Sequence, residues 1–231
     1  MDAWAETDPS AAIQWFTDHQ QTSDNPTAQR SDPQMRLFSN WLSSDETAAR
    51  KWLSANPSHS LAQRAHDALA MHLVNSGRSE EALRAFNRFP SEKNADLALV
   101  LAGAITEDDP VAAGDWVASL PPGVAQNAAI GGVIFQWAER DPGACAEWIT
   151  EFPAGDSKDR AMAAYADTLS SKTPSIAAEW VEQIQDSYRR TVAAKATFRS
   201  WRTSDPRAAV EWFRNVSGIL EVIRADELRY E

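Results

Sequence analysis

The chain carries a twelve-residue segment that begins and ends on Trp and recurs along its length. Residues 137–148 read WAERDPGACAEW, residues 4–15 read WAETDPSAAIQW, and residues 201–212 read WRTSDPRAAVEW. Residues 41–52, WLSSDETAARKW, keep the same Trp spacing. Self-similarity at a fixed spacing is typical of repeat architectures. Tandem repeats therefore constrain this fold more than any other feature of the sequence.

The second Trp of the segment sets a period of 32 residues. The last four copies follow one another at intervals of 32, and the interval from Trp52 to Trp116 is 64. We expect one degenerate copy between these two, centred on Phe86. The seven predicted repeats centre on Trp15, Trp52, Phe86, Trp116, Trp148, Trp180 and Trp212, and all ten Trp residues of the chain occupy one of the two Trp positions.

Each repeat predicts a short helix with the same starting point. The residue seven before each central aromatic can cap a helix, because its side-chain oxygen accepts a hydrogen bond from a free backbone N–H. These residues are Asp8, Asp45, Ser79, Asp109, Asp141, Thr173 and Asp205. Pro or Glu comes next, and both suit the first turn of a helix. Each cap should stabilise the fold by about 1 kcal/mol.

A longer helix is predicted after each short one. We expect these helices at 34–43, 59–75, 92–106, 124–139, 157–171, 187–202 and 219–230. No alternating Val and Ile run suggests a strand. One helix pair cannot bury both of its apolar faces, so neighbouring pairs must stack. The sequence therefore predicts an all-α fold, an α-solenoid of about seven helix pairs of roughly 32 residues that forms one domain over residues 1–231.

One stretch resembles a known family. Residues 61–90, LAQRAHDALAMHLVNSGRSEEALRAFNRFP, resemble a tetratricopeptide repeat, with Gly77 at the turn, Phe86 in the second helix and Pro90 after it. The other six copies use Asp-Pro or a similar pair instead of the turn Gly. They are similar to Trp- and Ala-rich helical repeats of uncharacterised bacterial proteins. Both resemblances imply a right-handed αα-superhelix with a concave binding face, and neither carries over specific peptide-binding residues.

The charge of the chain narrows the classes of partner. The formal net charge is −11, which repels phosphate backbones and anionic lipid and so disfavours nucleic acid and membrane surfaces. Basic or mixed-charge protein segments are more natural partners, although the charge can also serve solubility alone. The longest apolar runs, Leu97–Ile105 and Ala128–Phe135, are too short to span a bilayer. We therefore predict a protein or peptide partner, no nucleic acid and no membrane insertion.

The sequence constrains the cellular compartment of the protein less than it constrains the class of partner. The single Cys145 cannot form an internal disulfide, and the N-terminus is acidic and polar, without the apolar segment of a signal peptide. Both features favour the cytoplasm for the chain as it stands. The chain begins and ends near repeat boundaries, which favours a piece of a longer array, and in that case export is the alternative. A complete protein whose charged last helix caps the array is the competing interpretation.

The sequence contains few residue patterns that are typical of catalysis or metal binding. It contains no GxSxG, HExxH, Walker A or CxxC motif, and the four His residues lack the i, i+4 spacing of a helical zinc pair. Cys145 takes a position that is Ala in most copies, which predicts a buried small residue. Gly131 and Gly132 lie between apolar residues inside a helix and predict close helix packing. We expect no catalytic residue, cofactor or metal, and hence no enzyme.

Two features are candidates for binding. The segment Asp18–Gln34 is polar and lengthens the first repeat by five residues. The longer helices carry Arg64, Arg160, Arg189 and Arg190. These side chains could form charge-assisted hydrogen bonds with carboxylates of a peptide in a concave groove. An insertion without function and an ordinary solvated face are the alternatives.

Three functions remain open. The first is a non-catalytic scaffold that binds a protein or peptide in its groove. The second is a helical array that carries or supports a lyase-like or transglycosylase-like activity, which requires a deep cleft with paired acid and base groups. The third is a structural module that self-associates end to end through its terminal repeats.

Overall fold

Helices are the only regular secondary structure in the part of the chain that the structure describes, and turns and loops connect them. The computed structural model describes residues 9–18, 32–88, 94–219 and 221–227, and it contains no strand in these ranges. The short helices are α2 (Pro9–Asp18), α5 (Ser79–Arg88), α7 (Pro110–Ser119), α9 (Pro142–Glu151), α11 (Pro174–Gln183) and α13 (Pro206–Asn215). The others are α3 (Pro33–Ala55), α4 (Ala62–Asn75), α6 (Ala95–Asp108), α8 (Val124–Arg140), α10 (Asp156–Leu169), α12 (Ser187–Ser204) and α14 (Glu221–Glu227). The all-α prediction is confirmed for these residues.

Helix α3 consists of two predicted helices joined by a kink. Asp45 has φ −150° and ψ 82°, which is not a helical conformation. Its Oδ1 atom accepts a hydrogen bond from the backbone N–H of Ala48 at 2.9 Å, so it caps the second part of the helix. The part of α3 after Asp45 is the short helix that the sequence predicts around Trp52.

Most of the predicted caps are present. Asp109 accepts hydrogen bonds from the N–H groups of Val111 and Ala112 at 3.0 Å, and Asp141 and Asp205 each accept one bond at 3.0 Å. The prediction is wrong for the side chain of Thr173, which precedes α11 but makes no cap hydrogen bond. A Pro at the first helical position supports this helix start without that bond. The predicted cap Asp8 lies outside the described residues.

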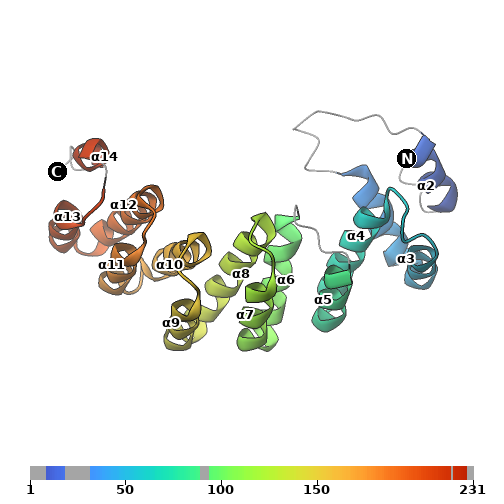
Figure 1. Ribbon diagram of the computed structural model, residues 1–231, viewed down its shortest axis with the longest axis horizontal. Coiled ribbons are helices and arrows are strands. Elements are labelled where there is room, and N and C mark those ends of the chain that lie inside the picture. The colour runs from blue at the N-terminus through green and yellow to red at the C-terminus, as the bar shows by residue number, and fades with distance from the viewer. Residues whose placement is uncertain (1–8, 19–31, 89–93, 220, 228–231) are drawn as a thin grey trace.

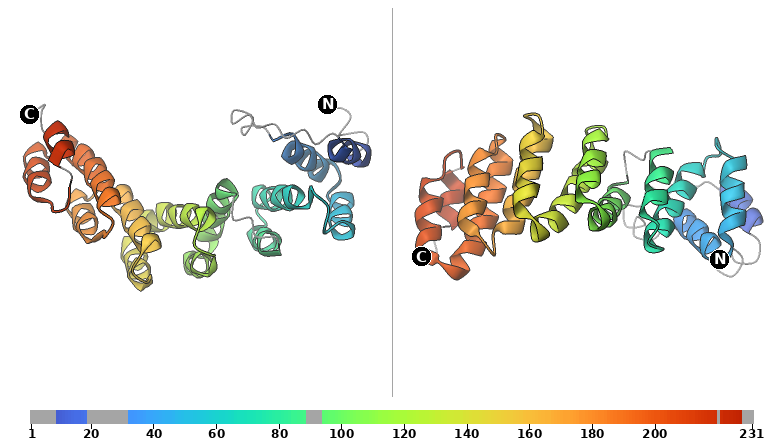
Figure 2. Two further views of the ribbon diagram at one scale, coloured as in Figure 1. Left: turned by 45° about the horizontal axis from the view of Figure 1, so that its top comes forward. Right: turned by 90° about the horizontal axis from the view of Figure 1, so that it is seen from below.

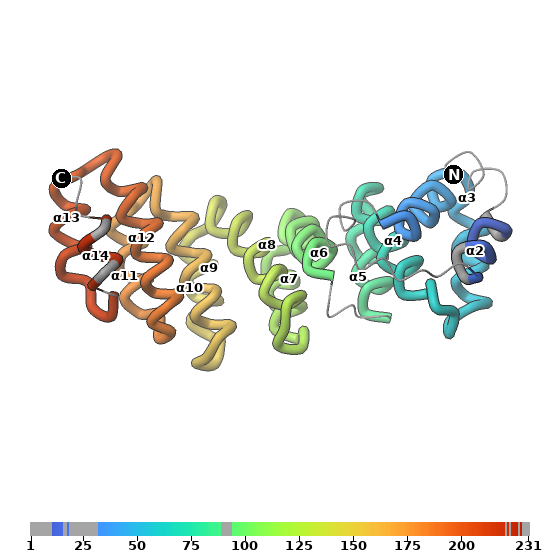
Figure 3. Tube along the Cα trace, turned by 90° about the horizontal axis from the view of Figure 1, so that it is seen from above, coloured from blue at the N-terminus to red at the C-terminus, as the bar shows by residue number. Residues whose placement is uncertain are grey.

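The helices form a curved row with α2 and α14 at opposite ends (Figures 1 and 2). Each of the longer helices α6, α8 and α10 contacts the next longer helix in the chain. The short helices α7, α9 and α11 lie along the lower side of the row in Figure 1, and Figure 3 shows the same row from above. None of the helices in the described ranges combines the length and the apolarity that are needed to cross a membrane.

The Trp residues pack between the helices. Nine of them are described: Trp41, Trp116, Trp137 and Trp148 are buried, and Trp15, Trp52, Trp180, Trp201 and Trp212 are half-buried. The two Trp positions that are eleven residues apart meet in space. The ring centroids are 6.3 Å apart for Trp41 and Trp52, 5.7 Å for Trp137 and Trp148, and 5.9 Å for Trp201 and Trp212. The recurring segment therefore encodes the contact between the end of a longer helix and the following short helix.

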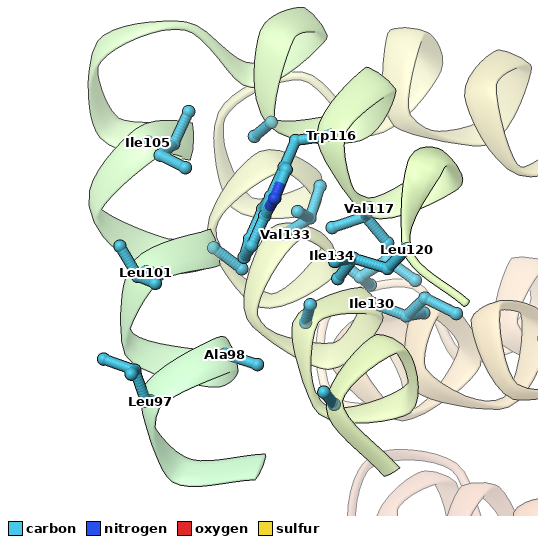
Figure 4. Packing of buried hydrophobic residues seen from close by; sticks show 14 of the residues in the cluster. Leu97, Ala98, Leu101, Ile105, Trp116, Val117, Leu120, Ile130, Val133 and Ile134 are labelled. Atoms are coloured by element: carbon cyan, nitrogen blue, oxygen red, sulfur yellow. The ribbon is translucent and has the colours of Figure 1, made fainter. Parts of the chain in front are cut away.

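Helices α6, α7 and α8 form the middle of the core. Figure 4 shows Trp116 and Val117 of α7 next to Val133 and Ile134 of α8, and Leu101 on the side of α6 that faces away from them. All five of these side chains are buried. Burial of a side chain of this size contributes about 1.5–3 kcal/mol, so this apolar cluster holds the three helices together.

Small residues permit the closest helix approaches. A Cβ atom on Gly132 would lie 2.7 Å from the carbonyl oxygen of Leu99, which confirms the predicted close packing of α8 on α6. Gly131 has nothing within 4 Å of its Cβ position, so the prediction is wrong for this residue. Cys145 is fully buried, as predicted, and burial, followed by the charge of Asp141, raises its pKa to about 12. The thiol is therefore an inert core residue.

Candidate binding cavity

In three of the later helix pairs, the central Trp reaches the short helix of the preceding pair. Trp148 of α9 packs on α7, where a Cβ atom on Gly114 would lie only 2.6 Å from the indole Nε1. Trp116 of α7 donates its Nε1–H to Asn87 of α5 at 3.2 Å. Trp212 of α13 likewise donates to a carboxylate of α11 at 3.0 Å. We call the space that receives such a Trp, next to the preceding short helix, the indole socket.

The backbone places α5 one residue earlier than the sequence predicts. The N–H of Ala82 donates to the carbonyl of Arg78, just as the N–H of Ala113 in α7 donates to the carbonyl of Asp109. Arg78 therefore takes the place of the capping Asp. Ser79, which the sequence predicts as the cap, is instead the first residue of α5.

This register corrects the predicted centre of the third repeat. Counted from the same helix start, Phe86 corresponds to Val117 rather than to Trp116, and both Phe86 and Val117 are buried. The residue that corresponds to Trp116 is Ala85. The prediction was wrong because this copy has neither Asp-Pro nor Trp to mark the register, and Phe86 is an aromatic residue only one position away.

A cavity lies where the missing indole of α5 would lie. Its volume is about 280 Å³. It is lined by Arg50, Leu53, Ser54, Pro57, His66, Leu69, Glu81, Arg84, Ala85 and Arg88, and we call it the α3–α5 cavity. Arg50 precedes Trp52 by two residues, as Gly114 precedes Trp116, so Arg50 stands where Gly114 supports the indole of Trp148. The cavity is thus an indole socket without its indole and with an arginine at its base.

A network of ion pairs holds Arg50 in place. Its guanidinium lies 2.7 Å from Glu46 and 3.2 Å from Glu81, and Arg78 bridges the same two carboxylates at 2.9 Å and 2.7 Å. Burial raises the pKa of Glu46, but the hydrogen bonds from Arg78 and Arg50 outweigh this effect and the pKa is lowered. Hydrogen bonding from Arg78 also lowers the pKa of Glu81. Both carboxylates are therefore charged at neutral pH and fix the arginine side chains.

The lining of the cavity is positive within an acidic chain. It contains the three guanidinium groups of Arg50, Arg84 and Arg88 against the single carboxylate of Glu81. Arg84 and Arg88 are exposed at its edge. Burial, followed by repulsion from Arg88, lowers the pKa of His66 to about 4, so this imidazole is neutral at pH 7. Because Arg50 is already paired with Glu46 and Glu81, the positive charge that the cavity offers to a ligand lies at its edge, on Arg84 and Arg88.

The four arginines predicted from the sequence lie on the longer helices but do not form one site. Arg64 of α4 lies 3.0 Å from Asp32, and Arg160 and Arg189 both lie 2.8 Å from the same carboxylate, that of Asp156. Arg190 donates to backbone carbonyls at the ends of α11 and α13, the closest at 2.7 Å. This side chain ties two loops together. The predicted segment Asp18–Gln34 lies mostly outside the described residues.

Arg50, Arg84 and Arg88 were not predicted from the sequence as binding residues. A usable signal was present two residues before the central Trp, a position that is small or aliphatic in the other five copies with a central Trp but is Arg50 in the second. A charge at a position that packs against an indole elsewhere indicates that no indole packs there. The absence of a Trp from the third repeat gives the same indication.

A second hollow lies at the outer face of α13. It is lined by Arg202, Pro206, Arg207, Val210, Glu211, Arg214 and Asn215, with a volume of about 910 Å³. Val210 occupies the position of Gly114 and Arg50 in its own helix. This hollow is therefore the indole-socket face of the last described short helix.

Neither hollow has the composition of a metal centre. No group of three or more His, Cys, Asp or Glu side chains in the described part of the chain is placed to hold a metal ion. Comparison with known proteins found no family model, no curated protein and no solved structure that matches the chain. The geometry of the molecule itself is thus the basis for a functional proposal.

Proposed function

We propose that the chain is a non-catalytic helical-repeat scaffold, a right-handed α-solenoid of about seven helix pairs, that binds a protein or peptide segment. The observation that carries the proposal is the α3–α5 cavity, an interior position of the repeat that is left open and lined with guanidinium groups. The central residues Trp52, Trp116, Trp148, Trp180 and Trp212 all pack on the apolar core. We infer that the one position that gives up this packing serves binding.

Binding rather than catalysis suits the groups around the cavity. Its side chains offer hydrogen-bond donors and aliphatic surface, and its one carboxylate, Glu81, is held by Arg78 and Arg50. Catalysis by acid and base groups needs a proton donor and acceptor with matched pKa values. Arginine remains protonated at all accessible pH values and is suited to recognition of carboxylates.

Selection from a random peptide library by the full chain tests the proposal. A scaffold of this kind should enrich a reproducible consensus sequence, and synthetic peptides with that consensus should bind in isothermal titration calorimetry. A heat-unfolded sample of the same chain is the control for adhesion to exposed apolar surface. Repeated selections without a shared consensus would contradict the scaffold proposal.

Self-association is a second candidate, favoured by the hollow on α13. This face has the register that receives an indole from the next pair elsewhere in the chain, and Val210 lies within it. A second copy of this chain that packs its own helices on this face would extend the row. Light scattering with the native chain and with Val210→Glu tests the candidate, since a strict monomer at high concentration in both samples would remove it.

A further inference from the structure

We propose that the α3–α5 cavity is a receptor site for a flat aromatic group that carries a carboxylate. The inference deepens the proposed binding function, because it names the chemistry of the ligand at one site. If the ligand is a free aromatic acid, the cavity can bind it even when the chain binds no protein partner. Two observations carry it, the shape of the cavity and the placement of its charges.

The shape of the cavity is that of an indole socket. In the equivalent contact between α7 and α9, Trp148 fills the socket and reaches the Gly114 position of the preceding helix. In the α3–α5 contact Ala85 leaves a volume of about 280 Å³ open. An apolar engineered cavity of about 150 Å³ already binds a benzene ring. The buried side chains of Leu53 and Leu69 supply apolar walls for a ring in this space.

The charges around the cavity select an acid rather than a neutral ring. Arg84 and Arg88 are on α5, four residues apart on one helix face, and both are exposed at the edge of the cavity. Arg84 also pairs with Glu80 at 3.4 Å, but both partners are largely exposed, so this pair is weak. A ligand carboxylate next to a ring in the cavity would lie between Arg84 and Arg88 and form charge-assisted hydrogen bonds in place of this weak pair.

A ring with a nearby carboxylate can reach the α3–α5 cavity from two sources. A partner segment can supply it as a Trp or Phe side chain next to an acidic residue, and the cell can supply it as a free aromatic acid. Both place a ring against Leu53 and Leu69 and a carboxylate against Arg84 and Arg88. The experiment therefore measures the shared chemistry first and then separates the sources.

Fluorine NMR of 5-fluoroindole-3-acetate, titrated with the full chain, tests the site without interference from the ten Trp residues. We expect a saturable change of the fluorine signal with the native chain. The uncharged probe 5-fluoroindole should bind at least tenfold more weakly. Equal binding of the two probes would overturn the assignment of a carboxylate site.

Substitutions in the cavity separate its shape from its charge. Ala85→Trp should fill the cavity and abolish binding of the probe, and the double variant Arg84→Gln with Arg88→Gln should weaken it at least tenfold. The matched control is Arg160→Gln with Arg189→Gln, which removes two arginines from the longer helices and should leave the affinity unchanged. Circular dichroism establishes that each variant is folded. If Ala85→Trp does not fold, Ala85→Leu, which fills the cavity in part, and the Arg84/Arg88 pair decide the outcome.

Binding that persists unchanged in the cavity variants would overturn the proposal, because the probe would then lie elsewhere. Displacement of the bound probe by the peptide acetyl-Asp-Trp-Asp-amide would assign the site to a partner segment. Displacement by unlabelled indole-3-acetate but not by the peptide would assign it to a free aromatic acid. A library consensus without any aromatic residue, together with an unresponsive probe, would leave the scaffold function intact and remove this inference alone.

Discussion

The contact between α7 and α9 and the contact between α3 and α5 follow one plan and end differently. In the first, Trp148 lies on Gly114 and closes the space between two short helices. In the second, Ala85 leaves that space open above Arg50. The rest of each contact is similar, with a buried aliphatic or aromatic residue next to the central position. A repeat can therefore give up one large side chain and keep its helices in register.

This comparison also shows how a uniform row acquires one distinct position. Stacked repeats share the stability of their neighbours, because each contact adds to the whole. The loss of one indole is thus tolerated if the flanking contacts are strong. The two contacts should therefore respond differently to substitution and to small ligands.

Trp148→Ala should have the largest effect. The indole packs on Gly114, and its ring lies 5.7 Å from Trp137 and 4.8 Å from Phe152. Truncation of a buried Trp costs about 3–5 kcal/mol of unfolding free energy. Urea denaturation followed by circular dichroism measures the loss, and a loss below about 1 kcal/mol would show that the filled socket adds little stability.

The same variant should gain a ligand. Truncation leaves a neutral socket above Gly114, so uncharged indole should raise the Tm of Trp148→Ala by more than it raises the Tm of the native chain. The native α3–α5 cavity differs in preferring an acid. A variant that collapses around the space would show no response to indole.

Gly114→Leu should have the next largest effect. A Cβ atom at this position already meets the Trp148 indole at 2.6 Å, so a larger side chain forces the two short helices apart. Overpacking of this kind costs about 1–3 kcal/mol. The cost should shrink when Gly114→Leu is combined with Trp148→Ala, because the indole is then absent. Gly131→Ala is the control, since nothing lies within 4 Å of its Cβ position and removal of a helical Gly should stabilise slightly.

Acid should destabilise the chain through His66. Its folded pKa is about 4, whereas an unfolded His takes up a proton near pH 6.5. Between these values the unfolded chain binds a proton that the folded chain does not, so stability falls as the pH falls through this window. The native chain should lose up to about 3 kcal/mol more than His66→Leu between pH 7 and pH 4. Burial raises the pKa of Asp67, but Asp67 titrates in both chains, so parallel stability curves would contradict the assignment to His66.

The sequence allowed much of the fold to be predicted because the signals are local. An Asp-Pro pair sets a helix start within one turn, as at Asp109 and Asp141. The eleven-residue Trp spacing predicted a repeated unit, and its two Trp residues meet in space in three copies. These features depend on capping and on the period of a helix, both of which can be read from a few neighbouring residues.

The candidate site could not be predicted in the same way. A cavity arises from a side chain that is missing, and Ala85 alone looks like an ordinary helix residue. That Ala85 stands in place of a Trp becomes clear only from the structure. The backbone hydrogen bond from Ala82 to Arg78 sets the register, and Phe86 then corresponds to the buried Val117. The arginines predicted from the sequence, such as Arg190, were expected to contact peptide carboxylates in a concave groove, and only three-dimensional contacts reveal that Arg190 ties backbone carbonyls together.

Ala85→Trp combined with Arg50→Gly should convert one contact into the other. Alone, Ala85→Trp should change the free energy of unfolding little. Burial of the new indole stabilises the fold, but the indole shares the socket with the Arg50 guanidinium and disturbs its pairs with Glu46 and Glu81, so the two effects offset each other. Alone, Arg50→Gly should cost about 1 kcal/mol, from weak ion pairs and from a Gly within a helix. Together they reproduce the Trp148–Gly114 geometry, so the double variant should be more stable than the sum of the two changes by about 1 kcal/mol, as a double-mutant cycle in urea would measure. Additive effects would mean that the new indole does not enter the space above residue 50, and the equivalence of the two contacts would then be wrong.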